Sequence, residues 1–169
     1  GVMVVAKHDA AHLELSRQFA DREIEKAYVA LVWGLINTGR RVDAPLGRDP
    51  VHRQKMSTRA RRARSAVTRI TGTERLRGLT LAMIAIATGR THQIRVHLNS
   101  IGHPVVGDSV YGGVRKHLAA DHRVLGTLDR PFLHAYRIGF VHPRDGRRVE
   151  FTAPLADDLQ AVLDVLRAR

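Results

Sequence analysis

The stretch that decides the fold is TGRTHQIRVHL, residues 88–98, which sets two arginines and two histidines between an expected strand and an expected helix. The nine residues before it, LTLAMIAIA (79–87), are almost continuously apolar, which is typical of a strand buried on both faces. Gly89 supplies the turn. The segment therefore predicts a strand, a turn and a helix in succession.

The expected helix begins near Thr91, which we predict to be its N-cap, and ends before Gly102, which we predict to adopt the left-handed conformation. Its apolar positions follow helical spacing: Ile94, Leu98 and Ile101. Arg90 falls in the turn and Arg95 one turn into the helix, so both guanidiniums can reach an anion near the helix N-terminus. This junction favours binding of a phosphate, a carboxylate or a base edge.

The charge of the whole chain agrees with an anionic partner. The 28 Lys and Arg residues outnumber 16 Asp and Glu, and the formal net charge is +12. Twelve of the basic residues, against three acidic ones, lie between Arg40 and Arg77, and the densest part is STRARRARS, residues 57–65. Nucleic acid is the partner that such a distribution favours. A charge run by itself fits a solvated basic loop better, and it is the arginines of residues 88–98 that shift the balance.

Composition excludes several classes of protein. The chain has 169 residues and is 44% hydrophobic, which fits one folded domain. It has no cysteine, so disulfides, iron–sulfur clusters and Cys-containing zinc sites are excluded. Aromatic residues make up 5%, too few for a single-strand binder built mainly on stacking. With no apolar run of membrane-spanning length and no signal peptide, we expect a soluble, cytoplasmic protein that does not bind membranes.

Working outward, the rest of the chain predicts more strands than helices. A helix capped by Asp9 is expected to carry Ala11, Leu15 and Phe19 on one face, and residues 154–166 are expected to form a final amphipathic helix opened by Pro154. The expected strands are residues 2–5, 26–33, 79–87, 132–140 and 149–153, with a loop and the basic segment between 45 and 77. There is no internal repeat and no domain boundary. We predict one mixed α/β (α+β) domain over residues 1–169, with a mostly antiparallel central sheet.

In this order, the segments resemble the catalytic domain of the RluA-type RNA pseudouridine synthases. The resemblance covers essentially the whole chain, and its most specific part is TGRTHQIRVHL followed at once by residues 101–112, IGHPVVGDSVYG. The other matching segments are EKAYVALVWG (25–34), LHA (133–135) and HPRDGRRVEFTAPLADDL (142–159). The resemblance implies isomerisation of uridine to pseudouridine in structured rRNA or tRNA, without a metal or an organic cofactor, by a protein that we expect to be a monomer.

The chemistry that the resemblance implies needs a uridine flipped out of its stack, with the N1–C1′ bond broken and a C5–C1′ bond made. The family's essential group is an aspartate beside the sugar, which either attacks it or assists proton loss at C2′. Arg95 matches the family's arginine partner of that aspartate, and Tyr28 matches the tyrosine that packs against the target base. Without the resemblance, Tyr28 would be expected in the core and Arg95 in an ordinary ion pair.

One part of the family pattern is missing. The family's aspartate lies in HRLDxxTSG, and Gly1 matches the last residue of that motif, so we expect the aspartate to lie just upstream of these 169 residues and the domain to be truncated at its N-terminus. Asp9, Asp21, Asp43, Asp49 and Asp108 lack its sequence context, and Asp108 is expected to stabilise a turn. We therefore predict that this chain alone does not catalyse the isomerisation.

Several residues are candidates for RNA contacts. Arg90, His92 and Gln93 are expected either to bind RNA or only to brace the turn. The basic segment adds candidates for contacts to phosphates: Lys55, Arg59, Arg61, Arg62 and Arg64. The ten histidines invite a metal hypothesis, but His8 and His12 have no third ligand at motif spacing, so no metal site is predicted.

Two other classes of function stay open at this point. A non-catalytic RNA-binding or chaperone domain would use the same basic surface without chemistry, and an HRLD motif upstream of Gly1 would argue against it. A ribosome-associated structural protein is also compatible with the isoelectric point of about 11.3. The second class predicts RNA binding that falls steeply with salt and shows little discrimination between RNAs.

Overall fold

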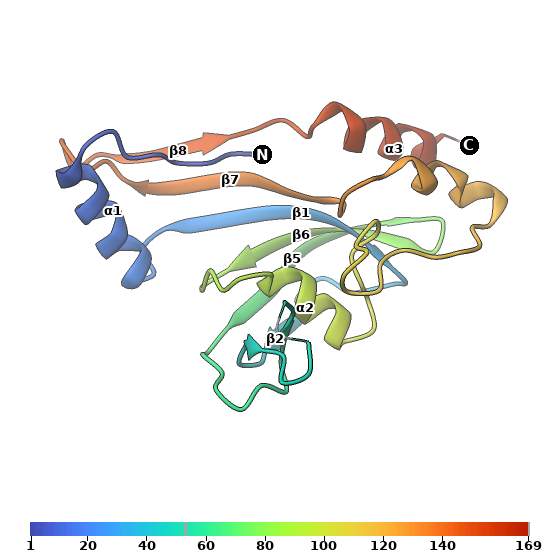
Figure 1. The fold of residues 1–169 in the computed structure, drawn as a ribbon. Helices are drawn as coiled ribbons and strands as arrows, with labels where there is room; N and C mark the ends of the chain where they lie inside the picture. The colour runs from blue at the N-terminus through green and yellow to red at the C-terminus, as the bar shows by residue number, and fades with distance from the viewer. Residues whose placement is uncertain (53, 169) are drawn as a thin grey trace.

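A computed structural model describes residues 1–52 and 54–168 and shows a six-stranded sheet with helices on both faces (Figure 1). The sheet order is β2-β5-β6-β1-β7-β8, and every neighbouring pair is antiparallel. A second, two-stranded sheet pairs β3 with β4. The elements are α1 (Asp9–Ala20), β1 (Glu25–Trp33), β2 (Arg41–Asp43), β3 (Gly47–Arg48), β4 (Met56–Ser57), β5 (Val67–Leu76), β6 (Leu79–Ile86), α2 (Gln93–Ser100), η1 (Ala120–Thr127), β7 (Leu133–Val141), β8 (Arg148–Thr152) and α3 (Asp157–Arg167). The predicted α+β class is confirmed.

The two central strands, β1 and β6, are buried on both faces, which is why each is a nearly unbroken apolar run. Leu31 and Leu81 lie in a core cluster with residues of α3 and η1. Val32 and Ile84 point to the opposite face, into a cluster with Ile94 and residues of the same helix, α2. Figure 1 shows α3 and η1 on one side of the sheet and α2 on the other. The alternation along β1 therefore assigns each side chain to one of the two layers, and Tyr28 belongs to the α2 side.

The helix α2 begins one residue later than predicted, and its cap differs. The N-cap is His92 rather than Thr91, with a left-handed φ of 55° and no hydrogen bond from its side chain to the helix. Gly102 adopts the predicted left-handed conformation with φ of 83° and follows the helix end. The prediction for the C-terminal end is therefore confirmed. The prediction of a Thr91 cap is wrong, because the turn continues through the left-handed His92 and the helix begins at Gln93.

The strand β5 is not evident in the sequence, where it falls inside the basic segment. It runs for ten residues and pairs with both β2 and β6. A bulge between Ile70 and Gly72 interrupts its register with β6, so buried and exposed positions do not keep one alternation along the strand. Together with exposed basic residues such as Arg69, this bulge hides the period-two pattern on which strand prediction depends.

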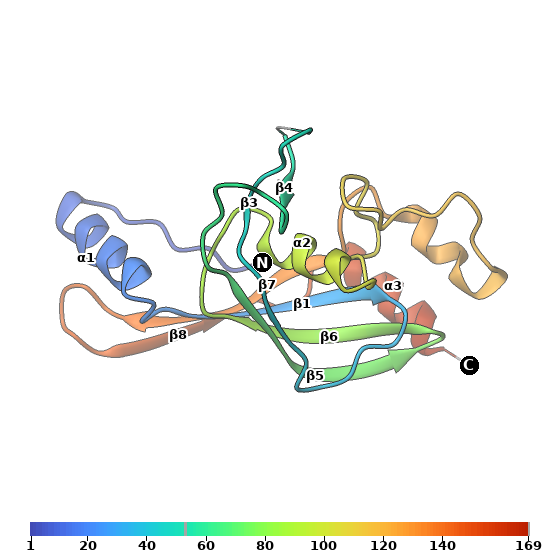
Figure 2. The same ribbon diagram turned by 90° about the horizontal axis from the view of Figure 1, so that it is seen from below.

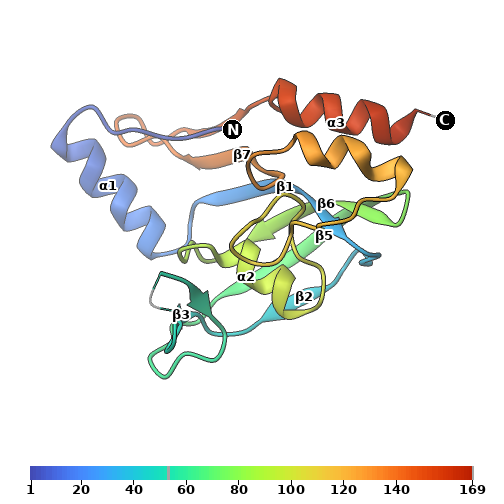
Figure 3. The same ribbon diagram turned by 45° about the vertical axis from the view of Figure 1, so that its right-hand side comes forward.

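The ends of the chain lie along the outer strands. Residues 2–5, predicted as a strand, are not in a named strand, although the Val2 N–H donates to the Ala135 carbonyl. Helix α1 begins at Asp9, but its cap is His8, whose Nδ1 accepts a hydrogen bond from the Ala11 N–H at 3.3 Å. Figure 3 shows α1 at the opposite end of the sheet from α3. Helix α3 begins at Asp157 rather than at Pro154, so that part of the prediction is wrong. Its apolar face is confirmed within the helix, where four residues are buried: Leu159, Val162, Leu163 and Leu166.

The small β3–β4 hairpin stands beside α2 and carries part of the basic segment (Figure 2). Its strands are two residues long, and Asp49 stabilises the turn by accepting hydrogen bonds from the Val51 and His52 N–H groups. None of the helices in the described part of the chain combines the length and the apolar character needed to span a membrane.

A buried histidine of α2 predicts how stability depends on pH. The His97 Nε2 lies 2.9 Å from the Ala44 carbonyl, so this nitrogen must donate, and Nδ1 lies 2.9 Å from Thr68 Oγ1. Because that hydroxyl already accepts from Gln93 Nε2, its proton goes to His97 Nδ1, and the imidazole is satisfied when neutral. Burial, the largest cause, lowers the pKa of His97.

We therefore expect the free energy of unfolding to fall by up to about 1.4 kcal/mol per pH unit as pH drops below about 6.5, where only the unfolded state takes up this proton. Urea titrations between pH 5 and 8 measure this slope. In His97→Gln the slope should flatten, whereas in His12→Gln, an exposed position of α1, it should not change. Equal slopes in the wild type and His97→Gln would contradict the assignment.

Candidate active site

The turn and first residues of α2 form one wall of a hollow of about 260 Å³ on the α2 side of the sheet. Tyr28 of β1 and Leu133 of β7 form the opposite wall. Five predicted site residues meet here: Tyr28, Arg90, His92, Gln93 and Arg95. The structure thus brings Tyr28 together with residues more than sixty positions further along the chain.

Arg95 is held by a buried carboxylate. Its Nε and Nη2 donate to the two oxygens of Asp108 at 2.6 and 2.8 Å, a bidentate pair, and the Asp108 side chain is fully buried. Burial raises the pKa of Asp108, but hydrogen bonds from Arg95 and the Tyr111 N–H outweigh it, so the carboxyl's pKa is lower than usual. The hydrogen bonds between Arg95 and Asp108 also raise the pKa of Arg95. Asp108 and Arg95 are therefore both charged and orient one another.

Asp108 has the turn-stabilising role predicted from the sequence. Its Oδ1 accepts hydrogen bonds from the Val110 and Tyr111 N–H groups, both at 3.0 Å. The pairing with Arg95 was not predicted. The only sequence signal for it was the proximity of the two motifs, in which Arg95 and Asp108 are thirteen residues apart, and spacing alone does not reveal that a loop folds back onto a helix.

Tyr111 links the hairpin to the site, a role that the sequence did not reveal. Its buried hydroxyl accepts from the Met56 N–H at 2.9 Å and lies 3.0 Å from His92 Nδ1. We assign the hydroxyl proton to the hydrogen bond with Nδ1, and in this tautomer Nε2 carries the proton of a neutral His92. The Arg95 guanidinium lies 4.9 Å from the centre of the Tyr111 ring. One side chain therefore contacts both His92, the N-cap, and Arg95 of α2.

His92 is kept neutral where a cation would be expected. Burial first, and then the nearby Arg95 charge, lower the pKa of its imidazole. Its left-handed backbone is rare for a residue with a side chain and is held by the surrounding contacts. At neutral pH, His92 thus offers the hollow a hydrogen-bond donor rather than a charge.

Gln93 braces the turn. Its Nε2 donates to the Val67 carbonyl and to Thr68 Oγ1, and its Oε1 accepts from Thr88 Oγ1 and the Arg90 N–H, all within 3.2 Å. The side chain is buried and its amide has protein partners on both sides. Two roles were expected from the sequence, an RNA contact and bracing of the turn, and this geometry supports bracing.

Tyr28 lies half-buried across the hollow from α2. A bulge between Ala27 and Tyr28 shifts the register of β1 against β7, and bulges of this kind often re-aim a side chain next to a site. Burial raises the pKa of the Tyr28 hydroxyl. The phenol therefore stays protonated at neutral pH and presents a flat apolar ring with one donor.

The basic candidates lie on the hairpin and on the segment after it. Arg90 Nε donates weakly to the Ser65 carbonyl at 3.4 Å, which ties the turn to that segment. Arg59, Arg61, Arg62 and Arg64 have exposed side chains, and Lys55 is half-buried. Within residues 1–52 and 54–168, none of these five side chains forms an ion pair, so their charges are available to an anion.

The first residues of the chain lie on the other side of Tyr28, where Val2, Tyr28 and Ala135 line a separate hollow. Val2 donates to the Ala135 carbonyl, and Ala135 is the β7 residue that pairs with Tyr28. A Cβ on Gly1 would come within 2.8 Å of the Ala135 backbone, so only glycine fits this approach. No aspartate lines the hollow among the described residues, and no group of three metal-ligating side chains occurs in that part of the chain.

Comparison with known proteins gives one family. The profile of the RNA pseudouridylate synthases matches residues 1–100. The chain is 43% identical over 169 residues to ribosomal large subunit pseudouridine synthase D of Zymomonas mobilis, covering 98% of this chain and 52% of that protein. It is 42% identical to an uncharacterised RNA pseudouridine synthase of Bacillus subtilis, covering 99% of this chain and 52% of that protein. The chain thus spans about half the length of the curated relatives it matches.

Solved structures agree on the fold. Human RNA pseudouridylate synthase domain containing 1 superimposes with a TM-score of 0.70 at 27% identity, over 98% of this chain and 74% of that one. The human domain-containing protein 4 gives a TM-score of 0.78 at 24% identity, which speaks for the fold alone. The six-stranded antiparallel sheet is therefore the architecture expected from the sequence resemblance.

Proposed function

Because this chain belongs to the RluA-type family of RNA pseudouridine synthases, we propose that it forms the Tyr28 and Arg95 part of an active site that isomerises uridine to pseudouridine in structured RNA. The observation that carries this proposal is the meeting of these two residues in one hollow. The reaction breaks the N1–C1′ bond of a flipped uridine, rotates the base and forms the C5–C1′ bond, so atoms and charge balance without a cofactor.

The geometry supports a distinct role for each residue. The ring of Tyr28 offers a flat surface for the uracil, and its protonated hydroxyl can donate to the base. Arg95, fixed by Asp108, places a permanent positive charge at the hollow, where it favours the anionic form of an approaching aspartate. His92 supplies a neutral donor beside it. These residues position and polarise, and the family's aspartate supplies the reactive carboxylate.

We propose that the 169 residues alone do not turn over uridine. Asp108 is occupied by Arg95 and two backbone N–H groups, so it does not match the free carboxylate that the reaction needs. An aspartate preceding Gly1 would arrive beside Tyr28, next to Ala135. In a tritium-release assay with ribosomal RNA, we expect no turnover by the chain itself and turnover after an HRLDxxTS segment is fused before Gly1. Turnover by the unextended chain would contradict this prediction.

Large-subunit ribosomal RNA is the target we favour over tRNA, because relatives such as that of Zymomonas mobilis are named for the ribosomal large subunit. We propose that the exposed arginines after the hairpin contact phosphates flanking the uridine. Removing one such cation from a phosphate reduces the dependence of log K on log salt by about 0.7–0.9. Replacing four arginines with alanine should therefore flatten the slope by about 3: Arg59, Arg61, Arg62 and Arg64.

Filter binding to a large-subunit rRNA stem-loop across a salt series measures that slope. A variant that removes the same charge elsewhere on the surface is the control: Lys7, Arg22, Arg123 and Arg144 to alanine. An unchanged slope in the first variant, or an equal change in both, would remove the arginines from the contact surface. Tight binding of RNA by the extended protein without turnover would instead favour a non-catalytic RNA-binding module.

A further inference from the structure

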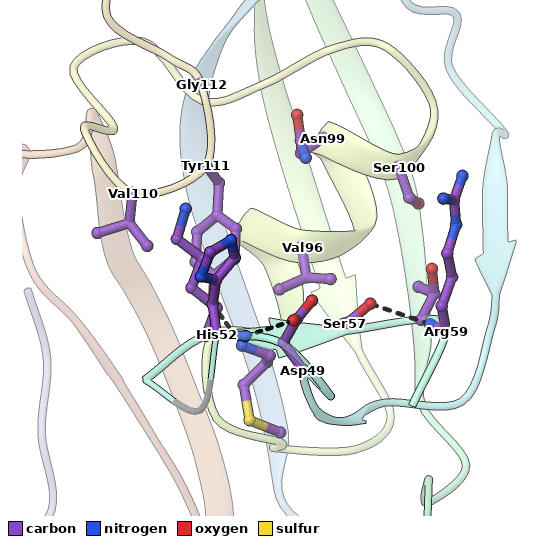
Figure 4. Close-up of a pocket in the computed structure, with 13 residues that line it drawn as sticks. Asp49, His52, Ser57, Arg59, Val96, Asn99, Ser100, Val110, Tyr111 and Gly112 are labelled. Atoms are coloured by element: carbon purple, nitrogen blue, oxygen red, sulfur yellow. Dashed lines mark hydrogen bonds between the residues drawn. The ribbon is translucent and has the colours of Figure 1, made fainter. Parts of the chain in front are cut away.

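A second hollow is larger than the one that holds Tyr28 and Arg95. A cavity of about 600 Å³ lies between the β3–β4 hairpin, the second half of α2 and the loop at residues 110–112 (Figure 4). Its volume falls within the range of about 300–1,000 Å³ typical of small-molecule sites. Tyr28, His92 and Arg95 do not line it, so a ligand bound there is separate from the uridine at Tyr28.

The cavity has an apolar floor and a polar rim. Val96 lies at the centre of the view in Figure 4, with Tyr111 and Val110 on one side and Asn99 and Ser100 on the other. Val96 and Tyr111 are almost fully buried, so they form the packed apolar bottom of the cavity, which a base can contact. The Asn99 side chain is exposed, and its amide has no hydrogen-bond partner within the described residues. An amide with a free donor and a free acceptor is suited to the edge of a nucleobase.

Charge on the rim favours an anion. Lys55 and Arg59 both line the cavity and neither forms an ion pair in the described part of the chain. The one carboxylate on the rim, Asp49, is turned to the Val51 and His52 N–H groups of its own turn. These hydrogen bonds, and then the charge of Lys55, lower the pKa of Asp49, so the rim carries one anion beside two cations and its net positive charge still favours a phosphate.

A third hollow adjoins these two. Its volume is about 490 Å³, and it shares His92 with the Tyr28 hollow and His52, Lys55 and Val110 with the larger cavity. A strand of RNA that places one base at Tyr28 would therefore pass His92 to reach Val96.

We propose that the larger cavity binds a second unpaired nucleotide of the same RNA strand, with its base on Val96 and at the Asn99 amide and its phosphate at Lys55 and Arg59. This inference rests on the proposed function, because it assumes an RNA substrate. It adds a specificity site: the chain selects its target by a second extruded base as well as by the uridine. Asn99 reads that base and takes no part in the chemistry.

A base-deletion scan combined with an Asn99→Ala variant tests the proposal. Fluorescence anisotropy first identifies the stem-loop that the wild-type chain binds most tightly in a tiled set of large-subunit rRNA fragments. Single abasic positions are then introduced through its loop. We expect one position other than the target uridine where base removal weakens wild-type binding about tenfold. Asn99→Ala should weaken binding of the intact RNA by about the same factor and should weaken binding of that abasic RNA no further.

Additive effects, or no such position, would overturn the proposal while leaving RNA binding intact. Absence of binding to every stem-loop would overturn both this inference and the RNA substrate on which it rests. Because Asn99 is exposed, the variant should fold, and its thermal unfolding curve checks this. Lys55→Ala gives an independent reading: it should reduce the salt slope by about one, whereas Lys7→Ala, before α1, should leave the slope unchanged. An unchanged slope in Lys55→Ala would count against the phosphate position.

Discussion

Replacing Arg95 with alanine should lower the free energy of unfolding by about 3 kcal/mol, because it leaves the carboxylate of Asp108 buried without its cation. The Asp108 side chain is fully buried, so water cannot replace the missing guanidinium, and only the backbone N–H groups of Val110 and Tyr111 remain as donors. The loop around Asp108 should loosen with the pair. Urea unfolding at pH 7 measures the change.

The control is the double variant Arg95→Ala with Asp108→Asn, which removes the buried charge as well as its partner. It should be more stable than Arg95→Ala alone, because the unpaired charge is then absent. A decrease below about 1 kcal/mol in Arg95→Ala would mean that the pair behaves like a surface ion pair. In the protein extended by the aspartate motif, Arg95→Ala should reduce turnover far more than RNA affinity, because its proposed role concerns the reacting carboxylate.

Gln93→Ala should also cost about 3 kcal/mol, since it removes a buried amide that serves four partners. The Val67 carbonyl, the Thr88 hydroxyl and the Arg90 N–H would each be deprived of a hydrogen bond inside the protein. These groups hold the turn against β5, so the position of His92 should be disturbed as well. Thermal or urea unfolding measures the change in stability, and amide hydrogen exchange at Arg90 reports the local opening.

Two further variants sharpen that test. Gln160→Ala removes an amide of α3 that donates to Asp164 on the exposed side of the helix, and it should change stability by less than about 0.5 kcal/mol. Gln93→Glu keeps the shape but replaces both amide donors with an anion and should be at least as damaging as alanine. Equal stability of Gln93→Ala and Gln160→Ala would show that the turn does not depend on the amide.

Most of the fold was predictable because its central elements carry their own pattern. The apolar runs of β1 and β6, the alternating strand β7 and the apolar face of α3 are local signals, and each was assigned from the sequence. The strand β5 was not, because its bulge breaks the alternation and charged residues cover its exposed face. The helix caps at Thr91 and Asp9 were predicted one residue away from the true positions, because cap geometry depends on how the preceding turn packs.

The site was predicted in its members but not in its contacts. Tyr28 and Arg95 came from the family resemblance, and the structure places them in one hollow, while their roles in the reaction stay predictions. The contact of Arg95 with Asp108 and the hydroxyl of Tyr111 between Met56 and His92 could not be predicted, since each depends on the fold of a loop. Gln93 shows the same limit: the sequence left an RNA contact and bracing of the turn equally open, because the partners that decide between them come from different segments of the chain.

By itself, the sequence determined the central strands β1, β6 and β7, the helices α2 and α3, the basic character of the chain and the family to which it belongs. These properties follow from the order of neighbouring residues. The tertiary structure alone decided which charges meet: it buried Asp108 against Arg95, enclosed Gln93 and left Lys55 and Arg59 beside an open cavity. The reason is physical, because burial and pairing depend on which distant segments pack together, and those contacts set whether a charge is neutralised inside the protein or left free for RNA.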